Sequence, residues 1–568
     1  MAFRSMQVDH DISETAWSES AQNFMRDCIQ KCTSDNKKCK LKETLLPTRV
    51  IEVGNVDGEQ LRLFETQGSG AVGQYAALSY CWGNDQPLKT TSANIRDMTA
   101  GKLLFSQLPQ TLADAVHVTR SLGIQYLWID ALCIIQDSID DWEKESAEMS
   151  TIYENAYLVI AASSSASATQ GFLSHQRQQS QLFTLCSDNG LRTVLAVRSP
   201  VRSGFHSDMD SKRVDPLAER AWAFQEQHMS TRCLIFSKDE LQWVCETGQT
   251  CEHIRSMRSS LPMKPFDHHP FLAAHCDDTR QTMASLGSTF QDAWWRAVSE
   301  YSGRKLTLAD DKLPAFAGFA KMFGARIRSR YIAGLWEANI VQDLLWRRLA
   351  PPGFASLPKD YRAPSFSWAS INEKVYYEPP NPRNTWISHS FVLDVGSVVP
   401  GRNPFGKVSD AWITIRGPMV RGSIEFGPDF GQEPNPKFRC DDQEIDSAST
   451  IWIDSAVGGF SYAGQDNTQE ISVRRCDPDD EGRRRYDSSK PAHPSRAQEP
   501  TQSNPGRASV WLLHLGRYTT GLPEDEPYSD DEYLVLGTSP RDTSKYERIG
   551  YCRGCRIQPL VEQTLTII

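Results

Sequence analysis

The sequence contains no apolar run long enough to cross a membrane and lacks three common catalytic signatures. Nowhere do about 18 apolar residues follow one another, and the segment 1–17 has no apolar core of a secretory signal. The phosphate-binding pattern GxxxxGK followed by Ser or Thr, the nucleophile pattern GxSxG and the zinc-protease pattern HExxH are absent. We therefore expect a cytoplasmic protein with no membrane span.

Positive charge is also scarce. The chain has 61 Lys and Arg residues against 71 Asp and Glu residues, which gives a formal net charge of -10. A protein that binds nucleic acid needs a basic surface to neutralise phosphate groups. We therefore expect no nucleic acid among the partners of this protein.

The 14 cysteines are distributed as reduced thiols rather than as a disulfide framework. Several lie inside apolar segments: Cys81, Cys133, Cys233 and Cys245. Three more lie near the N-terminus, and one CxxC lies near the C-terminus: Cys28, Cys32 and Cys39, then Cys552 and Cys555. Neither group has a second ligand pair at zinc-finger spacing, so we expect no metal and no cofactor.

At 568 residues the chain exceeds the size at which one hydrophobic core usually stops growing, so two or three units are expected. A Pro-, Ser- and charge-rich insertion at about 474–502 cannot bury enough apolar area to order itself. The N-terminal segment 1–73 is predicted to contain a helix at Ala21–Cys32 and an edge strand at Leu46–Val53. It is followed by an α/β domain at 74–255 and a helical region at 256–350. The last segment, 351–568, is predicted to be β-rich and to contain the insertion.

The stretch around residues 74–162 predicts alternating strands and helices. Strands are predicted at Gln74–Gly83, Tyr126–Ile135 and Tyr157–Ala162, where apolar residues run almost unbroken. Apolar residues at helical spacing predict helices at Leu108–Gly123 and Asp141–Asn155. This order implies a doubly wound, mostly parallel α/β sheet.

Glu145 lies in the middle of the apolar face of the second helix. At about 100° per residue it shares that face with a set of large side chains, namely Trp142, Met149, Ile152 and Tyr153. A carboxylate on a core-facing stripe must find a partner, take up a proton or face a cleft. Two interpretations stay open: a hydrogen-bonded structural carboxylate, or a pocket residue and candidate catalytic group.

Ligands of open α/β sheets bind beyond the carboxyl ends of the strands. Applied here, that rule predicts a substrate site formed by Tyr80, Trp82, Gly83, Asp130, Gln136 and Asp137, near Ser79 and Glu145. The alternative is that the aromatic residues pack the edge of the sheet and that Asp130 caps a loop. Further along, Cys233–Phe236 and Leu241–Cys245 predict a hairpin. Polar residues are dense around it, and a satisfied buried network is the preferred interpretation: Arg220, Gln225, Glu226, Arg232 and Glu246.

Several long blocks together resemble the fungal heterokaryon-incompatibility (HET) domain. They are YAALSYCWG at 75–83, LPQTLADAVHVTRSLGIQYLWIDALCIIQD at 108–137, DWEKESAEMSTIYENAYLVIAAS at 141–163 and ERAWAFQE at 219–226. The resemblance implies a cytosolic fungal protein in which this domain triggers growth arrest or cell death after non-self recognition. It also implies a distant similarity to TIR domains, some of which cleave NAD with a glutamate on the helix after a central strand.

The resemblance therefore suggests one enzymatic hypothesis and several alternatives. In the enzymatic hypothesis NAD is a substrate, Glu145 is catalytic, Trp82 stacks on a base or nicotinamide, and Asp130 or Gln136 holds ribose hydroxyls. The protein would signal through self-association or a protein partner. The alternatives are an enzyme or accessory protein of a fungal secondary-metabolite pathway, with an apolar small-molecule ligand, and an inert recognition scaffold.

Overall fold

The computed structural model describes most of the chain, and no helix in the described part is long and apolar enough to span a membrane. The predicted insertion at 474–502 and the second cysteine of the CxxC lie outside the described residues. The described residues are 14–35, 39, 44–55, 57–66, 69–84, 87–177, 181–186, 192–197, 215–246, 248–252, 283–349, 358, 360–378, 384–426, 437–440, 443–444, 450–453, 506–520, 529–554, 557 and 560–568.

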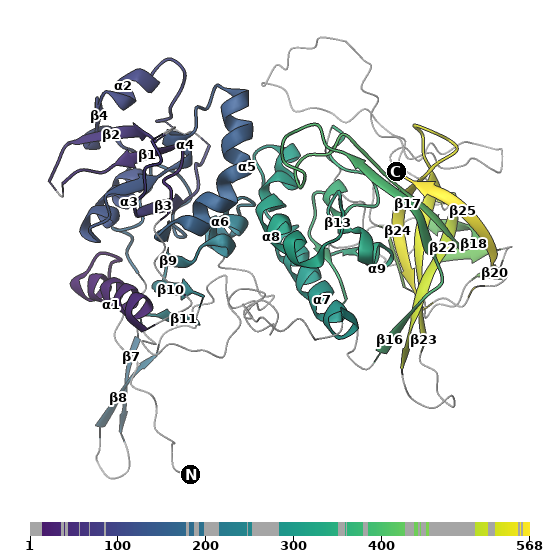
Figure 1. Ribbon diagram of the computed structural model, residues 1–568. Coiled ribbons are helices and arrows are strands. Elements are labelled where there is room, and N and C mark those ends of the chain that lie inside the picture. Colours follow the sequence, from purple (N-terminus) through teal and green to yellow (C-terminus); the bar gives the residue numbers. More distant parts are fainter. Residues whose placement is uncertain are drawn as a thin grey trace, which may run out of the picture. The chain divides into compact units, whose positions relative to one another are not determined.

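The chain divides into two compact units. Unit 1 comprises Met1–Thr282, Arg304–Leu306 and Ala315–Phe319. Unit 2 comprises Met283–Gly303, Thr307–Pro314 and Ala320–Ile568. In Figure 1 the helices and sheet of unit 1 run from purple to teal, and the β-rich part of unit 2 runs from green to yellow.

Unit 1 is built on one mixed sheet. Its nine strands follow the order β11-β10-β9-β6-β3-β5-β1-β2-β4. Their bounds are β1 (Arg49–Glu52), β2 (Gln60–Glu65), β3 (Tyr75–Ser79), β4 (Leu103–Leu104), β5 (Tyr126–Trp128), β6 (Leu158–Ala161), β9 (Arg232–Phe236), β10 (Leu241–Cys245) and β11 (Gly248–Cys251). A separate antiparallel hairpin joins β7 (Gln181–Cys186) to β8 (Arg192–Val197).

The middle of this sheet is parallel, as the alternating strands and helices predicted. β3 pairs with β5 on one side and β6 on the other, and β6 pairs with β9, all in parallel. The outer strands pair antiparallel, including the predicted β9–β10 hairpin. The prediction of an edge strand at Leu46–Val53 is wrong, because β1 pairs with both β5 and β2 and so lies inside the sheet.

The helices of unit 1 agree closely with the predicted periodicity. The predicted helices at Leu108–Gly123 and Asp141–Asn155 correspond to α3 and α5, and Ser138 caps α5 by accepting a hydrogen bond from the Asp141 amide at 3.3 Å. The helical elements are α1 (Glu19–Asp35), α2 (Ile95–Thr99), η1 (Phe105–Gln107), α3 (Gln110–Ser121), α4 (Asp130–Cys133), α5 (Ile139–Asn155), η2 (Pro216–Glu219) and α6 (Ala223–Met229).

The strand predicted at Tyr126–Ile135 is wrong in its second half. β5 ends at Trp128, and Asp130–Cys133 forms the short helix α4. The Asp130 side chain accepts a hydrogen bond from the Ala131 amide at 2.7 Å, which favours a helical turn. Apolar periodicity could not reveal this turn, because a buried helical turn and a buried strand are both continuously apolar.

Tyrosine side chains connect α5 to the parallel strands. Tyr75 on β3 donates to the carbonyl of Ile152 at 2.6 Å, and Tyr153 on α5 donates to the carbonyl of Leu78 at 2.9 Å. Tyr153 also packs edge-on against Trp128, with ring centroids 5.6 Å apart. All five residues of β3 are buried, so the apolar face of α5 lies on the sheet as its periodicity predicted.

Unit 2 begins with helices and short strands. The predicted helical region 256–350 is not helical to its end, because α9 ends at Asp343 and residues 347–348 form a strand. The elements are α7 (Met283–Tyr301), η3 (Ala309–Lys312), η4 (Pro314–Phe316), α8 (Ala317–Ile327), β12 (Tyr331–Ile332), β13 (Leu335–Trp336), η5 (Glu337–Asn339), α9 (Ile340–Asp343), β14 (Arg347–Arg348), η6 (Trp368–Ser370) and β15 (Val375–Tyr376). Within these elements, the segment Ala315–Phe319, which includes the last two residues of η4 and the first three of α8, belongs to unit 1.

The rest of unit 2 is β-rich, as predicted. Ten strands share one sheet, in which the long strand β18 pairs with β17, β19, β22 and β25. They are β16 (Asn384–Ser388), β17 (Phe391–Val398), β18 (Asp410–Phe426), β19 (Lys437–Cys440), β20 (Gln443–Glu444), β21 (Thr450–Ile453), β22 (Gly506–Thr520), β23 (Ser529–Thr538), β24 (Tyr546–Arg553) and β25 (Val561–Ile567).

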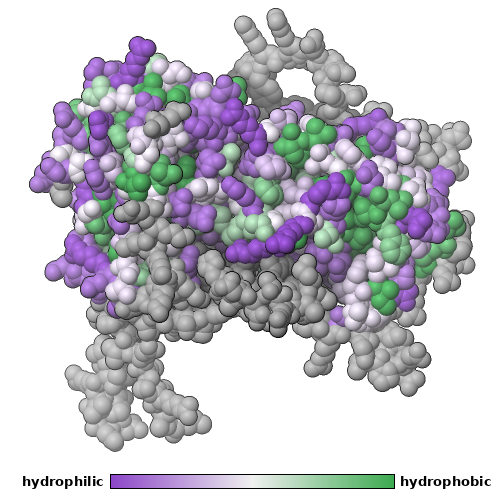
Figure 2. Space-filling view, in the orientation of Figure 1, coloured by the Kyte–Doolittle hydropathy of each residue, from purple (hydrophilic) through white to green (hydrophobic). Residues whose placement is uncertain are grey.

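Exposed apolar side chains gather on this β-rich part. In Figure 2 green residues cluster over the region where Figure 1 labels β17 and β25. The large apolar residues exposed on these strands are Phe391, Leu393 and Val398 on β17 and Val561 on β25. Unit 1 shows mostly hydrophilic residues in the same view.

Candidate functional site

A cluster of charged and aromatic side chains lies at the carboxyl ends of β3 and β5. Ser79 is the last residue of β3, and Asp130 begins α4 just after β5. α5 contributes Tyr153, the segment after η2 contributes Arg220, and α6 contributes Glu226. The parallel sheet thus brings five separate segments together at one edge, as the strand-end rule predicts.

Asp130 is held by donors from several directions. The Trp82 indole nitrogen donates to Oδ2 at 2.9 Å, and the Arg220 Nη2 lies 3.6 Å from the same oxygen. The Tyr80 hydroxyl also donates to this carboxylate. Burial raises the pKa of Asp130, while Arg220, Trp82 and Tyr80 oppose the shift. Asp130 therefore acts as the common acceptor for the aromatic side chains that follow β3.

Glu226 is the second carboxylate of the cluster and is only 1% exposed. Its Oε2 accepts a hydrogen bond from the Ser79 hydroxyl at 2.5 Å. Burial raises its pKa from 4.5 to about 7, against the opposing effects of Arg220, Ser79 and Tyr153. A group with this pKa changes charge close to neutral pH, so Glu226 is the residue of the cluster best placed to exchange a proton.

Arg220 is the cation that balances these two acids. Its Nη1 donates to the Tyr80 carbonyl, which fixes the guanidinium beside β3. Burial disfavours the charged guanidinium, but the facing carboxylates of Glu226 and Asp130 outweigh this and raise the pKa of Arg220. Two buried acids therefore share one cation, an arrangement that leaves them unequal in proton affinity.

Gly83 shapes the loop after β3. Its backbone has a φ of +80°, and a Cβ there would lie 2.6 Å from the Cβ of Ser167. Both features favour glycine, the first because of backbone sterics and the second because of the close approach of another segment. Gly83 therefore keeps the loop closed against Ser167, and whether it also contacts a substrate stays a prediction.

Gly83→Ala is expected to lower the stability of unit 1 by about 1–3 kcal/mol, through the strained φ together with the clash with Ser167. The measurement is urea unfolding of the full chain, followed by the fluorescence of its tryptophans. Gly101→Ala is the matched control, because Gly101 has a φ of +75° with no atom within 4 Å of its Cβ position. Equal losses of unfolding free energy in both variants would show that the contact with Ser167 does not contribute to the effect of Gly83→Ala.

Gln136 and Asp137 make loop contacts outside the cluster. The Gln136 amide donates to the carbonyls of Asp130 and Ile134 at 3.0 and 3.1 Å. Asp137 accepts from the backbone and hydroxyl of Ser92 at 2.8 and 3.1 Å, and this lowers its pKa. Gln136 stabilises the turn after α4, and Asp137 joins the α4–α5 connection to Ser92. Their contacts with a substrate remain predictions.

Glu145 is buried, as its position on α5 predicted, with 1% of its surface exposed. Burial raises its pKa, while Thr48 and Arg49 at the start of β1 oppose the shift. Its Oε1 lies 3.9 Å from the Lys144 ammonium and accepts no hydrogen bond within the described part of the chain. Its contacts are thus with the residues before and within β1 and not with Trp82 or Asp130, the predicted partners.

Arg49 is a residue that sequence reasoning missed. It donates to the carbonyl of Cys133 at 2.6 Å and to Asp141 Oδ2 at 3.1 Å, and its side chain is buried. A charged residue inside the apolar strand LPTRVIEV was the available signal. By contrast, Arg220 and Glu226 were identified in advance as members of a buried polar network, and the structure places both in one.

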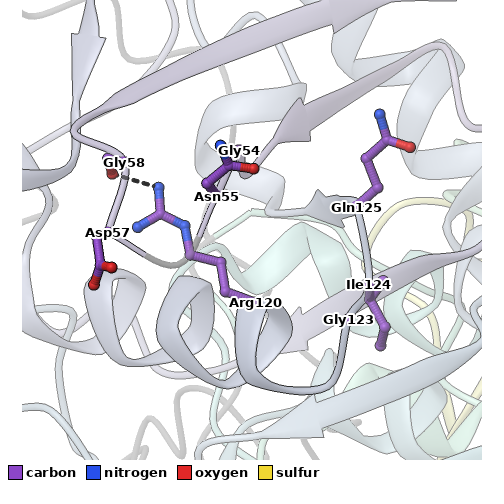
Figure 3. Close-up of a pocket in the computed structure, with 8 residues that line it drawn as sticks. All are labelled: Gly54, Asn55, Asp57, Gly58, Arg120, Gly123, Ile124 and Gln125. Atoms are coloured by element: carbon purple, nitrogen blue, oxygen red, sulfur yellow. Dashed lines mark hydrogen bonds between the residues drawn. The ribbon is translucent and has the colours of Figure 1, made fainter.

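A surface hollow lies elsewhere in unit 1. It has a volume of about 750 Å³ and is lined by residues of the β1–β2 turn and of the α3–β5 connection (Figure 3), among them Gly54, Asp57, Arg120 and Gln125. Arg120 donates to the carbonyls of Val53 and Gly58, each at 2.7 Å. Because Gln125 precedes β5, this hollow lies at the opposite strand ends from the Asp130 cluster.

A glycine-rich segment precedes β3. Residues 68–73 read GSGAVG, which matches the GxGxxG pattern of dinucleotide-binding loops. That pattern is meaningful where it follows a strand and opens a helix, so that the helix N-terminus meets the pyrophosphate. Here it is followed by the strand β3, which begins at Tyr75, so the helical context is missing.

The fold and the cluster define an α/β protein that holds two acids and an arginine at the carboxyl edge of a parallel sheet. Residues 75–226, which run from β3 into α6, match the family model "Heterokaryon incompatibility protein (HET)". The resemblance found in the sequence blocks is thereby confirmed over this segment. Comparison with curated proteins and with solved structures found no match to the chain.

Proposed function

We propose that this protein acts in heterokaryon incompatibility, as an effector of growth arrest or cell death whose active part is the α/β unit. The observation that carries the proposal is the position of the charged cluster. The match to the HET family covers 75–226, and Asp130, Arg220 and Glu226 all lie within that segment.

The effector unit extends beyond the matched segment. β1 and β2 precede it and extend the sheet beside β5, whereas β9 and β10 follow it and extend the sheet beside β6. Isolated residues 75–226 would expose the edges of β5 and β6, which favours aggregation. The functional tests below therefore use the full chain.

Inducible expression of the full chain in a filamentous fungus is expected to arrest growth or kill the cells. Viable colonies would be counted after induction, with protein levels measured by immunoblot. A version with a stop codon at Tyr75 serves as the control, because it produces the N-terminal segment without the HET domain. Normal growth at a confirmed high level of full-length protein would overturn the proposal.

A chemical form of this proposal is cleavage of NAD. In parallel strand order β5, β3, β6 and β9 form the series 2-1-3-4, which is the start of the flavodoxin-like order, and such sheets bind nucleotides at their carboxyl ends. Hydrolysis would break the bond between nicotinamide and ribose C1′ and add water at that carbon. Glu145 is buried beside Thr48 and Arg49, and Trp82 is hydrogen-bonded to Asp130, so NAD could reach these two groups only after a local rearrangement around each of them.

The NAD hypothesis is tested by incubating the purified full chain with NAD and separating nicotinamide and ADP-ribose by chromatography. Product is expected from the wild-type chain and from Glu148→Gln, because Glu148 lies exposed on the same helix. Glu145→Gln is expected to form none. Equal product from Glu145→Gln and the wild-type chain would show that Glu145 is not catalytic. If no chain forms product, NAD is not a substrate, and the effector proposal is unaffected.

A further inference from the structure

Three cysteines from distant parts of unit 1 meet in the interior. Cys32 lies on α1, Cys39 follows this helix, and Cys245 is the last residue of β10. Their sulfur atoms all lie within 4.8 Å of one another, and all three residues are buried, with at most 1% exposed. This convergence of thiols was not anticipated from cysteine spacing, which predicted no metal.

The spacing of the three sulfurs suits a tetrahedral metal. Zinc binds cysteine sulfur at about 2.3 Å, so two sulfurs on one tetrahedral zinc lie about 3.8 Å apart. A disulfide requires a sulfur–sulfur bond of about 2.05 Å and can join only two of the three thiols. A purely apolar role would not require three sulfurs to converge from a helix, a loop and a strand end.

A buried arginine beside the thiols supplies an independent observation. Arg232 is 3% exposed and is the cross-strand neighbour of Cys245 in the β9–β10 pairing. Its guanidinium donates to the carbonyl of Cys39 and, at 3.1 Å, to that of Tyr157, whose ring it also covers. Within the described part of the chain, no carboxylate lies within 4.0 Å of Arg232.

The buried guanidinium of Arg232 favours negative charge on the neighbouring sulfur atoms. A buried cation is costly unless an anion compensates it. Three thiolates on a divalent ion carry a net charge of about -1, which the neighbouring guanidinium of Arg232 balances. Three neutral thiols would provide no such balance.

We propose that Cys32, Cys39 and Cys245 bind a zinc ion. Its fourth position is taken by water or by a ligand outside these three side chains. The ion fastens α1 and the segment after it to the end of the β9–β10 hairpin, and Arg232 positions Cys39 through its carbonyl. The proposal stands apart from the proposed effector function, because it concerns the folding of unit 1 and not the Asp130 cluster.

Zinc binding by these residues is expected to depend on pH. Cysteine binds zinc as the thiolate, so the three thiols must lose their protons when the ion binds. Binding of zinc deprotonates them, so that affinity is expected to fall as the pH is lowered.

The test is the metal content of the full chain, purified without chelators in a thiol-free reducing buffer. Elemental analysis is expected to find about one zinc ion per chain. Cys39→Ser and Cys245→Ser are expected to lose it, while Cys552→Ser keeps it, because Cys552 is a buried thiol of unit 2. Replacement of zinc by cobalt is expected to produce thiolate-to-cobalt charge-transfer absorption in the wild-type chain and not in Cys39→Ser.

A second measurement covers the case in which the variants fail to fold. Removal of zinc from the wild-type chain with a chelator is expected to lower the unfolding midpoint, and added zinc is expected to restore it. The proposal is overturned if the wild-type chain neither holds nor takes up zinc or cobalt. It is also overturned if Cys39→Ser folds and keeps the metal, or if mass spectrometry finds two of the three cysteines joined by a disulfide.

Discussion

Arg220→Ala is expected to destabilise unit 1 by about 3–5 kcal/mol, the usual cost of leaving buried charges without their partner. Arg220 faces both Asp130 and Glu226, and each of these carboxylates is at most 6% exposed. Without the guanidinium, both acids would have to take up protons or remain charged in a region of low dielectric constant. The Tyr80 carbonyl would also lose its donor.

Urea unfolding of the full chain measures this effect, with the transition of unit 1 followed separately from that of unit 2 because two units need not unfold together. Lys102→Ala is the matched control. Lys102 forms an ion pair with Asp97 at 2.7 Å, but both side chains are more than 60% exposed, so its loss should cost about 0–1 kcal/mol. An Arg220→Ala effect no larger than that of the control would contradict the role assigned to the cluster.

Glu226→Gln is expected to change how the stability of unit 1 depends on pH. Burial raises the pKa of Glu226 to about 7 in the folded chain, from 4.5, so the folded chain holds this proton more tightly than the unfolded chain does. The stability associated with the proton is complete below about pH 4.5 and is lost as the pH rises through about 7. The loss is about 3–4 kcal/mol at most, since each pKa unit corresponds to about 1.4 kcal/mol.

Glutamine resembles the protonated acid but cannot ionise. The variant should therefore match the wild-type chain near pH 4.5 and be more stable at pH 8, and urea unfolding across this range would show the divergence. Glu148→Gln, an exposed change on α5, should leave the pH dependence as in the wild-type chain. Parallel pH curves for the wild-type chain and Glu226→Gln would show that Glu226 stays ionised in the folded chain.

Local patterns in the sequence were sufficient for the parallel core of unit 1. Unbroken apolar runs marked β3 and β6, and helical spacing marked α3 and α5, since these elements are buried along their whole length or along one face. The burial of Glu145 followed from the same spacing. Each of these inferences depends only on residues that are close together in the chain.

The partners of these residues were decided by tertiary structure. Glu145 was expected beside Trp82 and Asp130, yet it contacts Thr48 and Arg49, because β1 inserts into the sheet next to β5. The position of β1 inside the sheet depends on its pairing with two strands, which its own composition does not reveal. The helical turn at Asp130–Cys133 was hidden for a similar reason, as its burial made it continuously apolar.

The cysteines also show that local sequence does not reveal which distant residues meet. By itself the sequence determined that Cys32 and Cys39 lie close to each other and that Cys245 ends a hairpin strand. Only the packing of α1 against β10 brings the third sulfur within 4.8 Å of the other two. The sequence therefore determined which segments are helices and strands and which of their faces are buried, because those properties follow from neighbouring residues. The tertiary structure decided which charged and sulfur-bearing groups meet, because such contacts join segments whose separation along the chain carries no signal of their distance in space.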